Sequence, residues 1–248
     1  MYQPKAKKFA LIALLYYVIM LLGYVIMGLL YQQGMKEYVL INWFHPGLAL
    51  FIVFLQGEGA DQLGFARINL RTNAKISGLI IVVVMGFALL YSDLPLHKLL
   101  QGAFYYLFTI AFVEELIFRG FLQNYLYGLR WNRKLIFILG ALLFSFIHLP
   151  FQMIIQQRLS LDYVVMAFPQ LVFTFLLHLF LCYVTSKRKD VLIPIALHFA
   201  LNYVQALLWF LKSGERWIVL ISRKKRFFYQ DWSDPCLRQK RRSKIRDT

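Results

Sequence analysis

The sequence predicts an all-α protein, a polytopic bundle of about seven transmembrane helices with a polar cluster near the membrane midplane. Of the 248 residues, 60% are hydrophobic and only 16% are charged, whereas a soluble domain is about 45–50% apolar and about 25% charged. The apolar residues form long uncharged stretches, several reaching the roughly 20 residues that cross a bilayer as a helix. One further apolar stretch, residues 101–128, is interrupted by charged residues. So much apolar surface in a chain of this length excludes a soluble globular domain.

Seven segments are predicted to span the membrane. They cover residues 9–31, 38–56, 76–92, 101–128, 133–157, 163–186 and 190–211. The first follows a basic start, as a signal peptide does, but it lacks a small-residue cleavage site and is expected to be a retained anchor. The chain divides into membrane helices over 1–99 with a polar insertion at 57–75, further helices over 100–211, and a basic tail at 212–248.

The formal net charge of +16 could indicate nucleic-acid binding, but the positions of the basic residues argue against it. Twelve of the 28 Lys and Arg residues follow Leu211, and most others lie in short connections between apolar stretches. Basic residues at the ends of spans set topology or contact anionic lipid headgroups. We therefore expect anionic lipid at the tail and no nucleic-acid partner. Cys182 and Cys236 have no spacing typical of a disulfide framework.

The distribution of Lys and Arg orients the predicted bundle. Basic residues gather at alternate ends of the spans, near positions 5–8, 67–75, 130–134 and 187–189, and the opposite ends carry only Lys36, Lys98 and Arg158. The positive-inside rule then predicts a cytoplasmic N-terminus, cytoplasmic loops at 128–134 and 185–190, and outer loops at 93–98 and 157–162. Seven spans also place the basic tail outside, which the same rule disfavours.

The fourth predicted span carries the charges inside the membrane. Glu115 and Arg119 are four residues apart, so on a helix they share a face and can pair. Glu114 is rotated by about 100° and is left free to face another group. One reading is a buried ion pair that only fixes helix packing. The other is functional, because intramembrane charges are rare and mark sites.

Two further spans place polar groups at a similar depth. His148 follows Phe144 by four residues, and His198 precedes Asn202 by four. At about 1.5 Å per residue in a core of about 30 Å, these groups and Glu114 fall near the midplane. The remaining polar candidates in the spans are interpreted as packing residues, namely His45, His178 and Ser145.

A carboxylate beside an imidazole can hold and deprotonate a water, and a second imidazole with an amide offers two donors to a developing oxyanion. These groups suit hydrolysis of a carbonyl compound without a covalent intermediate. Alternatively, Glu114, His148 and His198 could ligate zinc, since two histidines and a carboxylate form a catalytic set. The sequence contains no His-Glu-x-x-His, nucleophile elbow or Walker loop.

The succession Glu114-Glu115-x-x-x-Arg119, Phe144-x-x-x-His148 and His198-x-x-x-Asn202 resembles the three-motif signature of the CPBP family. This family comprises the type II CAAX prenyl endopeptidases and the bacteriocin-processing and immunity proteins, also called Abi proteins. The resemblance covers about residues 100–211, which would be its catalytic helices. The N-terminal spans and the basic tail match no family pattern.

The resemblance implies an intramembrane endopeptidase acting on a membrane-associated, prenylated or secreted peptide, with no cofactor, although the family was long classed as metalloproteases. Glu114 and His148 would activate the water, Glu115 and Arg119 would support them, and His198 with Asn202 would form the oxyanion site. The expected location is the bacterial plasma membrane. The alternatives are a non-enzymatic partner of the same fold, acting in bacteriocin self-immunity or on a sensor kinase, and a proton-coupled transporter. Absence of inverted repeats disfavours the transporter.

Overall fold

The computed structural model describes residues 2–35, 37–65 and 69–213. In this part of the chain, seven helical segments are long and apolar enough to cross a membrane. They are α1 (Lys7–Gln32), α2 (Tyr38–Leu55), α3 (Leu70–Tyr91), a central helix (Leu96–Leu129), α7 (Arg133–Phe146) continued by α8 (His148–Ile155), α9 (Leu161–Arg188) and α10 (Leu192–Ser213). The described residues contain no β-strand, and the all-α polytopic fold is confirmed. The predicted tail, with its expected lipid contact, lies almost wholly outside the described residues.

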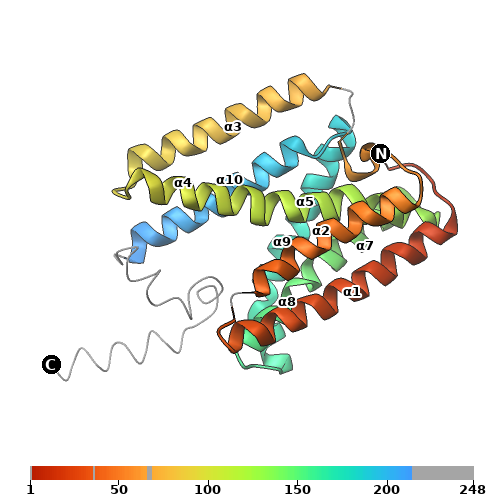
Figure 1. The fold of residues 1–248 in the computed structure, drawn as a ribbon, viewed down its shortest axis with the longest axis horizontal. Helices are drawn as coiled ribbons and strands as arrows, with labels where there is room; N and C mark the ends of the chain where they lie inside the picture. Colours follow the sequence, from red (N-terminus) through yellow and green to blue (C-terminus); the bar gives the residue numbers. More distant parts are fainter. Residues whose placement is uncertain (1, 36, 66–68, 214–248) are drawn as a thin grey trace.

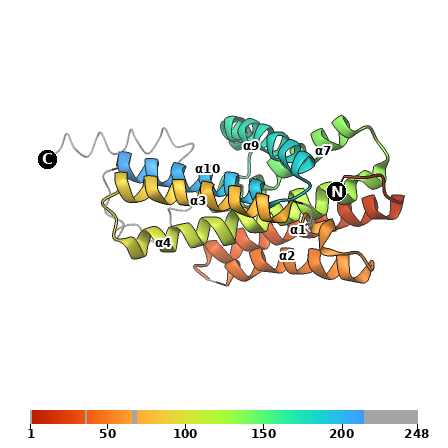
Figure 2. The same cartoon turned by 90° about the horizontal axis from the view of Figure 1, so that it is seen from above.

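The central helix crosses the molecule and connects two groups of helices (Figure 1). Its first half packs against α10, which in turn packs against α3. Its second half packs against α1 and α2, while α8 lies along α1 and α7 along α9. Figure 2 shows α7 and α9 on one side of the central helix and α2 on the other. A residue in the middle of this helix can therefore be reached from both groups.

The sequence led us to expect one regular α-helix in this span, but the central helix is irregular. It consists of α4 (Leu96–Phe104), π-helical η2 (Tyr105–Phe112), α5 (Val113–Glu115), π-helical η3 (Leu116–Leu122), α6 (Gln123–Tyr125) and 3-10 η4 (Leu126–Leu129). π-Helical turns are rare and occur frequently at functional sites. Both glutamates of the first motif lie in the short α-helical piece between the two π segments.

Two boundaries differ from the expectation. Helix α3 begins at Leu70, so the polar insertion expected over 57–75 ends earlier, and its described residues include the short 3-10 helix η1 (Ala60–Leu63). The fifth predicted span is interrupted at Ile147, between α7 and α8. Pro150 explains this interruption, because it has no N–H to donate to the carbonyl four residues earlier and its ring crowds that carbonyl.

Gly120 allows η1 to approach the central helix. A Cβ atom at this position would overlap the backbone carbonyl oxygen of Leu63. Only glycine permits backbone to approach so closely. This packing holds the connection between α2 and α3 against η3, the segment that carries Arg119.

Candidate functional site

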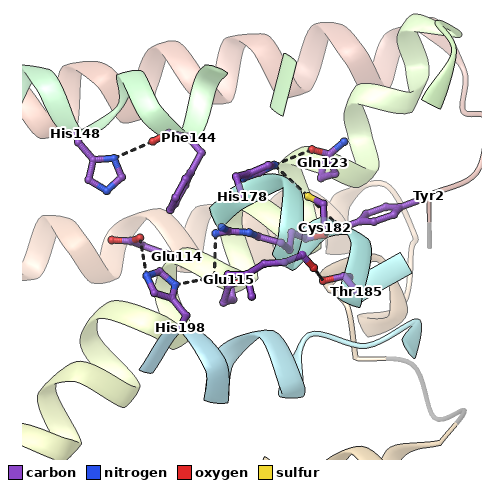
Figure 3. Close-up of polar contacts among 12 residues, drawn as sticks. Tyr2, Glu114, Glu115, Gln123, Phe144, His148, His178, Cys182, Thr185 and His198 are labelled. Carbon is purple, nitrogen blue, oxygen red and sulfur yellow. Dashed lines mark hydrogen bonds and ion pairs between the residues drawn. The ribbon is translucent and has the colours of Figure 1, made fainter. Parts of the chain in front are cut away.

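The candidate site forms where the central helix meets α10. The ring of His198 lies between the two glutamates of the first motif (Figure 3). Its Nδ1 is 2.7 Å from Oε1 of Glu115, and its Nε2 is 3.8 Å from Oε2 of Glu114. The first contact is a hydrogen bond, and the second is too long for one. The two ring nitrogens of His198 thus lie next to two different carboxylates.

Glu115 and Arg119 form the expected ion pair. Both side chains are fully buried, and Nη1 of Arg119 is 2.9 Å from Oε1 of Glu115. The guanidinium carbon also lies 4.1 Å from the ring centroid of Phe144, a cation–π contact. Among the described residues the guanidinium makes no hydrogen bond of good geometry, despite the short contact with Glu115. The cation is therefore held by charge and by the aromatic face.

Glu114 is not in this pair. Its carboxylate is partly exposed, at 13%, whereas that of Glu115 is at 0%. It lines a hollow whose empty volume, including its open mouth, is about 530 Å³. The hollow lies between the C-terminal half of α1, the start of α2, η2 and α8, and is rich in tyrosine. Its other lining residues are Tyr24, Met27, Tyr31, Tyr38, Val39, Asn42, Tyr105, Thr109, Ile110 and Phe151.

His148 begins α8 and is partly buried. Its Nδ1 is 2.8 Å from the carbonyl oxygen of Phe144, the residue one turn earlier. Because a carbonyl only accepts, Nδ1 carries the proton in this bond and Nε2 is directed elsewhere. Figure 3 shows this ring extending from the Phe144 side toward the space at Glu114. The ring of Phe144 packs edge-on against both imidazoles, at centroid distances of 5.1 Å to His148 and 6.3 Å to His198.

The other sequence candidates occupy different surroundings. Asn202 lies one turn beyond His198 on α10, is partly buried, and makes no hydrogen bond within the described part of the chain. Ser145 and His178 are packing residues with partners, Leu171 for Ser145 and Gln123 for His178. His45 is buried as expected, but neither ring nitrogen has a hydrogen-bond partner among the described residues.

The zinc alternative does not fit this arrangement. Within the described residues, no group of three or more His, Cys, Asp or Glu side chains is placed to hold a metal ion. The fixed cation of Arg119 lies on the same carboxylate as Nδ1 of His198, and it would repel a dication held at this cluster. No step below is derived through a metal.

Sequence reasoning did not anticipate the hydrogen bond between Glu115 and His198. These residues are 83 positions apart, and nothing in the local spacing of either motif connects them. It also missed a buried network behind Arg119, in which His178 contacts Gln123 and Cys182. A cysteine four residues after a histidine was the available signal, because this spacing places both on one helical face.

Comparison with known families supports the resemblance inferred from the sequence. Residues 96–204 match the family model described as type II CAAX prenyl endopeptidase Rce1-like. This range contains the central helix and all three motifs. No curated protein and no solved structure matches the chain. The chain is therefore an integral membrane protein, and its residues 96–204 are similar to the CAAX-type intramembrane proteases.

Proposed function

We propose, because residues 96–204 match the Rce1-like family model, that this protein is an intramembrane endopeptidase that uses a water activated by Glu114. The observation that carries the proposal is that the two adjacent glutamates have different surroundings. Glu115 is neutralised by Arg119 and bonded to His198, whereas Glu114 faces the hollow and pairs with no Lys or Arg of the described residues. A carboxylate in that position is suited to accept a proton.

The proposed reaction begins with one water oxygen beside Glu114. Nε2 of His198 and Oε2 of Glu114 are 3.8 Å apart, so a single water can contact both. Glu114 takes a proton from this water as its oxygen attacks the peptide carbonyl carbon. When the tetrahedral intermediate collapses, the C–N bond breaks and protonated Glu114 returns the proton to the leaving amine.

His148 is proposed to assist Glu114 with the water, and His198 with Asn202 to stabilise the oxyanion. The bond from Nδ1 of His148 to the Phe144 carbonyl fixes its ring. For His198, the bond to Glu115 fixes the orientation of Nε2. Nε2 donates only when both ring nitrogens carry protons, and that cation would have a carboxylate on either side. Asn202, on the same face of α10, has an amide available to donate.

The proposed substrate is a membrane-associated peptide that reaches Glu114 through the tyrosine-rich hollow. The parts of α1 and α2 that line this hollow are the ends that lie away from the Lys5–Lys8 segment. The family description names prenylated CAAX proteins. In a bacterium, a secreted peptide or its leader is the substrate that we propose. We also propose a bacterial plasma-membrane location with a cytoplasmic N-terminus, from the distribution of Lys and Arg.

The test compares the membrane peptides of cells that contain the wild-type protein, no protein, or Glu114→Gln. The amide is nearly isosteric with the carboxylate but cannot take the proton. Cleavage of the peptide that accumulates in the variant is then measured with purified protein, where the rate should fall by at least about 10²-fold.

The matched control is Glu37→Gln, which makes the same chemical change at an exposed position before α2. It should cleave at the wild-type rate. If Glu114→Gln cleaves as fast as this control, Glu114 is not the base, and the binding role of a bacteriocin-immunity or sensor-kinase partner replaces the proposal.

A further inference from the structure

The segment before α1 lies against the central helix instead of extending into solvent. The ring of Tyr2 is buried and stacks on that of Tyr127, with centroids 5.7 Å apart and planes at 6°. It also packs edge-on against Phe137, at a centroid distance of 5.6 Å. Tyr2 therefore fills a site between η4 and α7, and the residues that follow it lead directly into α1.

Two hydrogen bonds connect Tyr2 to the central helix. Its hydroxyl donates to the backbone carbonyl of Arg119 at 2.9 Å, and its backbone N–H donates to Oδ1 of Asn124 at 2.8 Å. Asn124 in turn donates to the side-chain oxygen of Gln62 at 2.7 Å. Tyr2 thus bridges two points of the central helix that are five residues apart.

The backbone of Tyr2 supports this interpretation. Its φ is 58°, in the left-handed region that aromatic residues rarely adopt. Such a conformation persists only where the surroundings specify it from several directions. Here the stacked ring, the hydroxyl bond and the N–H bond together do so.

The hydroxyl of Tyr2 is not needed to attach this segment. Lys5 forms an ion pair with Glu58, and the hydroxyl of Tyr125 donates to the same carboxylate at 2.6 Å. Lys8 also donates to Gln56 at 3.0 Å. These bonds fasten the start of α1 to the connection after α2 whether or not the Tyr2 hydroxyl is present.

The carbonyl that Tyr2 holds belongs to the residue that supports the candidate site. Arg119 lies in the π-helical segment η3, whose backbone hydrogen bonds join residues five positions apart instead of four. Its guanidinium pairs with Glu115, which holds the ring of His198, whose Nε2 faces Glu114. Figure 3 shows Tyr2 entering this cluster from the side opposite to Glu114 and His148.

We propose that Tyr2 is a positioning residue for the proposed endopeptidase. Its hydroxyl fixes the backbone at Arg119, and through Glu115 this fixes the orientation of His198 beside Glu114. The inference rests on the proposed function, because it concerns the geometry of the same reaction. It adds a residue 112 positions before Glu114 that no motif of the family signature contains.

The test is Tyr2→Phe, which retains the stacked ring and removes only the hydroxyl. Purified protein is assayed on the peptide whose loss from membranes depends on Glu114. We expect kcat to fall by about 10-fold to 100-fold with KM within about twofold of wild type, since small misplacements of reacting groups have effects of this size. The denaturant midpoint of unfolding should change little, because the ring and the Lys5 contacts are retained.

Tyr203→Phe is the matched control. This residue is also buried, and its hydroxyl donates to the carbonyl of Leu99 at 2.9 Å, away from Arg119. It should keep the wild-type kcat. If Tyr2→Phe has the kcat of this control, or if it lowers only stability while kcat per folded molecule is unchanged, Tyr2 has a structural role alone. Glu114→Gln in the same assay separates the two hypotheses. An active Glu114→Gln refutes the proposed function and this inference together, whereas an inactive one beside a fully active Tyr2→Phe refutes the inference only.

Discussion

Removal of the Arg119 cation should destabilise the protein more than any other single change in the site. In Arg119→Met, the apolar side chain fills much of the vacated volume, but Glu115 is left as a fully buried carboxylate without its cation. Breaking a buried ion pair in this way costs about 3–5 kcal/mol. The cation–π contact with Phe144 adds up to about 2 kcal/mol. The hydrogen bond from His198 to Glu115 is retained and offsets part of this, so we expect a loss of about 3–5 kcal/mol.

Glu115→Gln combined with Arg119→Met tests whether this loss comes from the stranded charge. Gln keeps an acceptor oxygen for Nδ1 of His198, and no uncompensated charge stays in the interior. The double variant should therefore lose less stability than the sum of the single variants, with a coupling energy of about 2–3 kcal/mol.

The assay is equilibrium unfolding of the four proteins in mixed micelles of a mild and a denaturing detergent. A loss of this size is a large part of a total stability of about 5–15 kcal/mol, so the yield of folded Arg119→Met should also fall. If the effects of the two substitutions add to within about 0.5 kcal/mol, the pair contributes no net interaction, and our account of Arg119 is wrong.

Four further predictions follow from the fold and the site. Gly120→Ala should destabilise by about 1–3 kcal/mol in the same unfolding assay, because its Cβ would overlap a facing carbonyl oxygen. Burial raises the pKa of Asp190, so the folded state disfavours its ionised form. The protonated carboxyl therefore contributes its full share of the folding free energy below the pKa of the unfolded state, which is about 3.9. This contribution is lost as pH rises through the higher pKa of the folded state. Asp190→Asn should accordingly be at least as stable as wild type at pH 7, and this advantage should disappear in titrations near pH 4. Cysteines placed at 157–162 should react with an impermeant maleimide from outside the cell and those at 185–190 should not; the reverse pattern contradicts the orientation. Peptide cleavage should persist in excess chelator at neutral pH, and a loss restored by zinc alone would contradict the metal-free mechanism.

Much of the fold follows from composition, because the bilayer limits the chain to few solutions. Uncharged stretches of about 20 residues must form helices to satisfy their backbone groups, which is why seven spans could be located. The pairing of Glu115 with Arg119 could also be predicted from the sequence, since it depends only on the helical repeat. Local spacing is sufficient where both partners lie on one helix.

The π-helical segments and the contact between Glu115 and His198 could not be predicted in this way. Both depend on how the central helix packs against its neighbours, and a single sequence contains no record of such distant pairs. The break before His148 was closer to prediction, because Pro150 is visible in the sequence. Prolines are tolerated in membrane helices, however, so the residue alone does not indicate a break.

The candidate site lies where two groups of helices meet, and the bond from His198 to Glu115 joins them. Helix α10 packs with α3 and the first half of the central helix, whereas Arg119 lies in the second half, which packs with α1 and α2. The bond from His198 to Glu115 therefore connects side chains from the two groups. A relative shift of the groups by about 1 Å would separate this imidazole from Glu115 or from Glu114, and a displacement of that size can lower an enzymatic rate by about 10²-fold. Contacts far from Glu114 that fix the second half of the central helix, including those of Tyr2, should consequently affect the rate of cleavage more than the binding of the peptide.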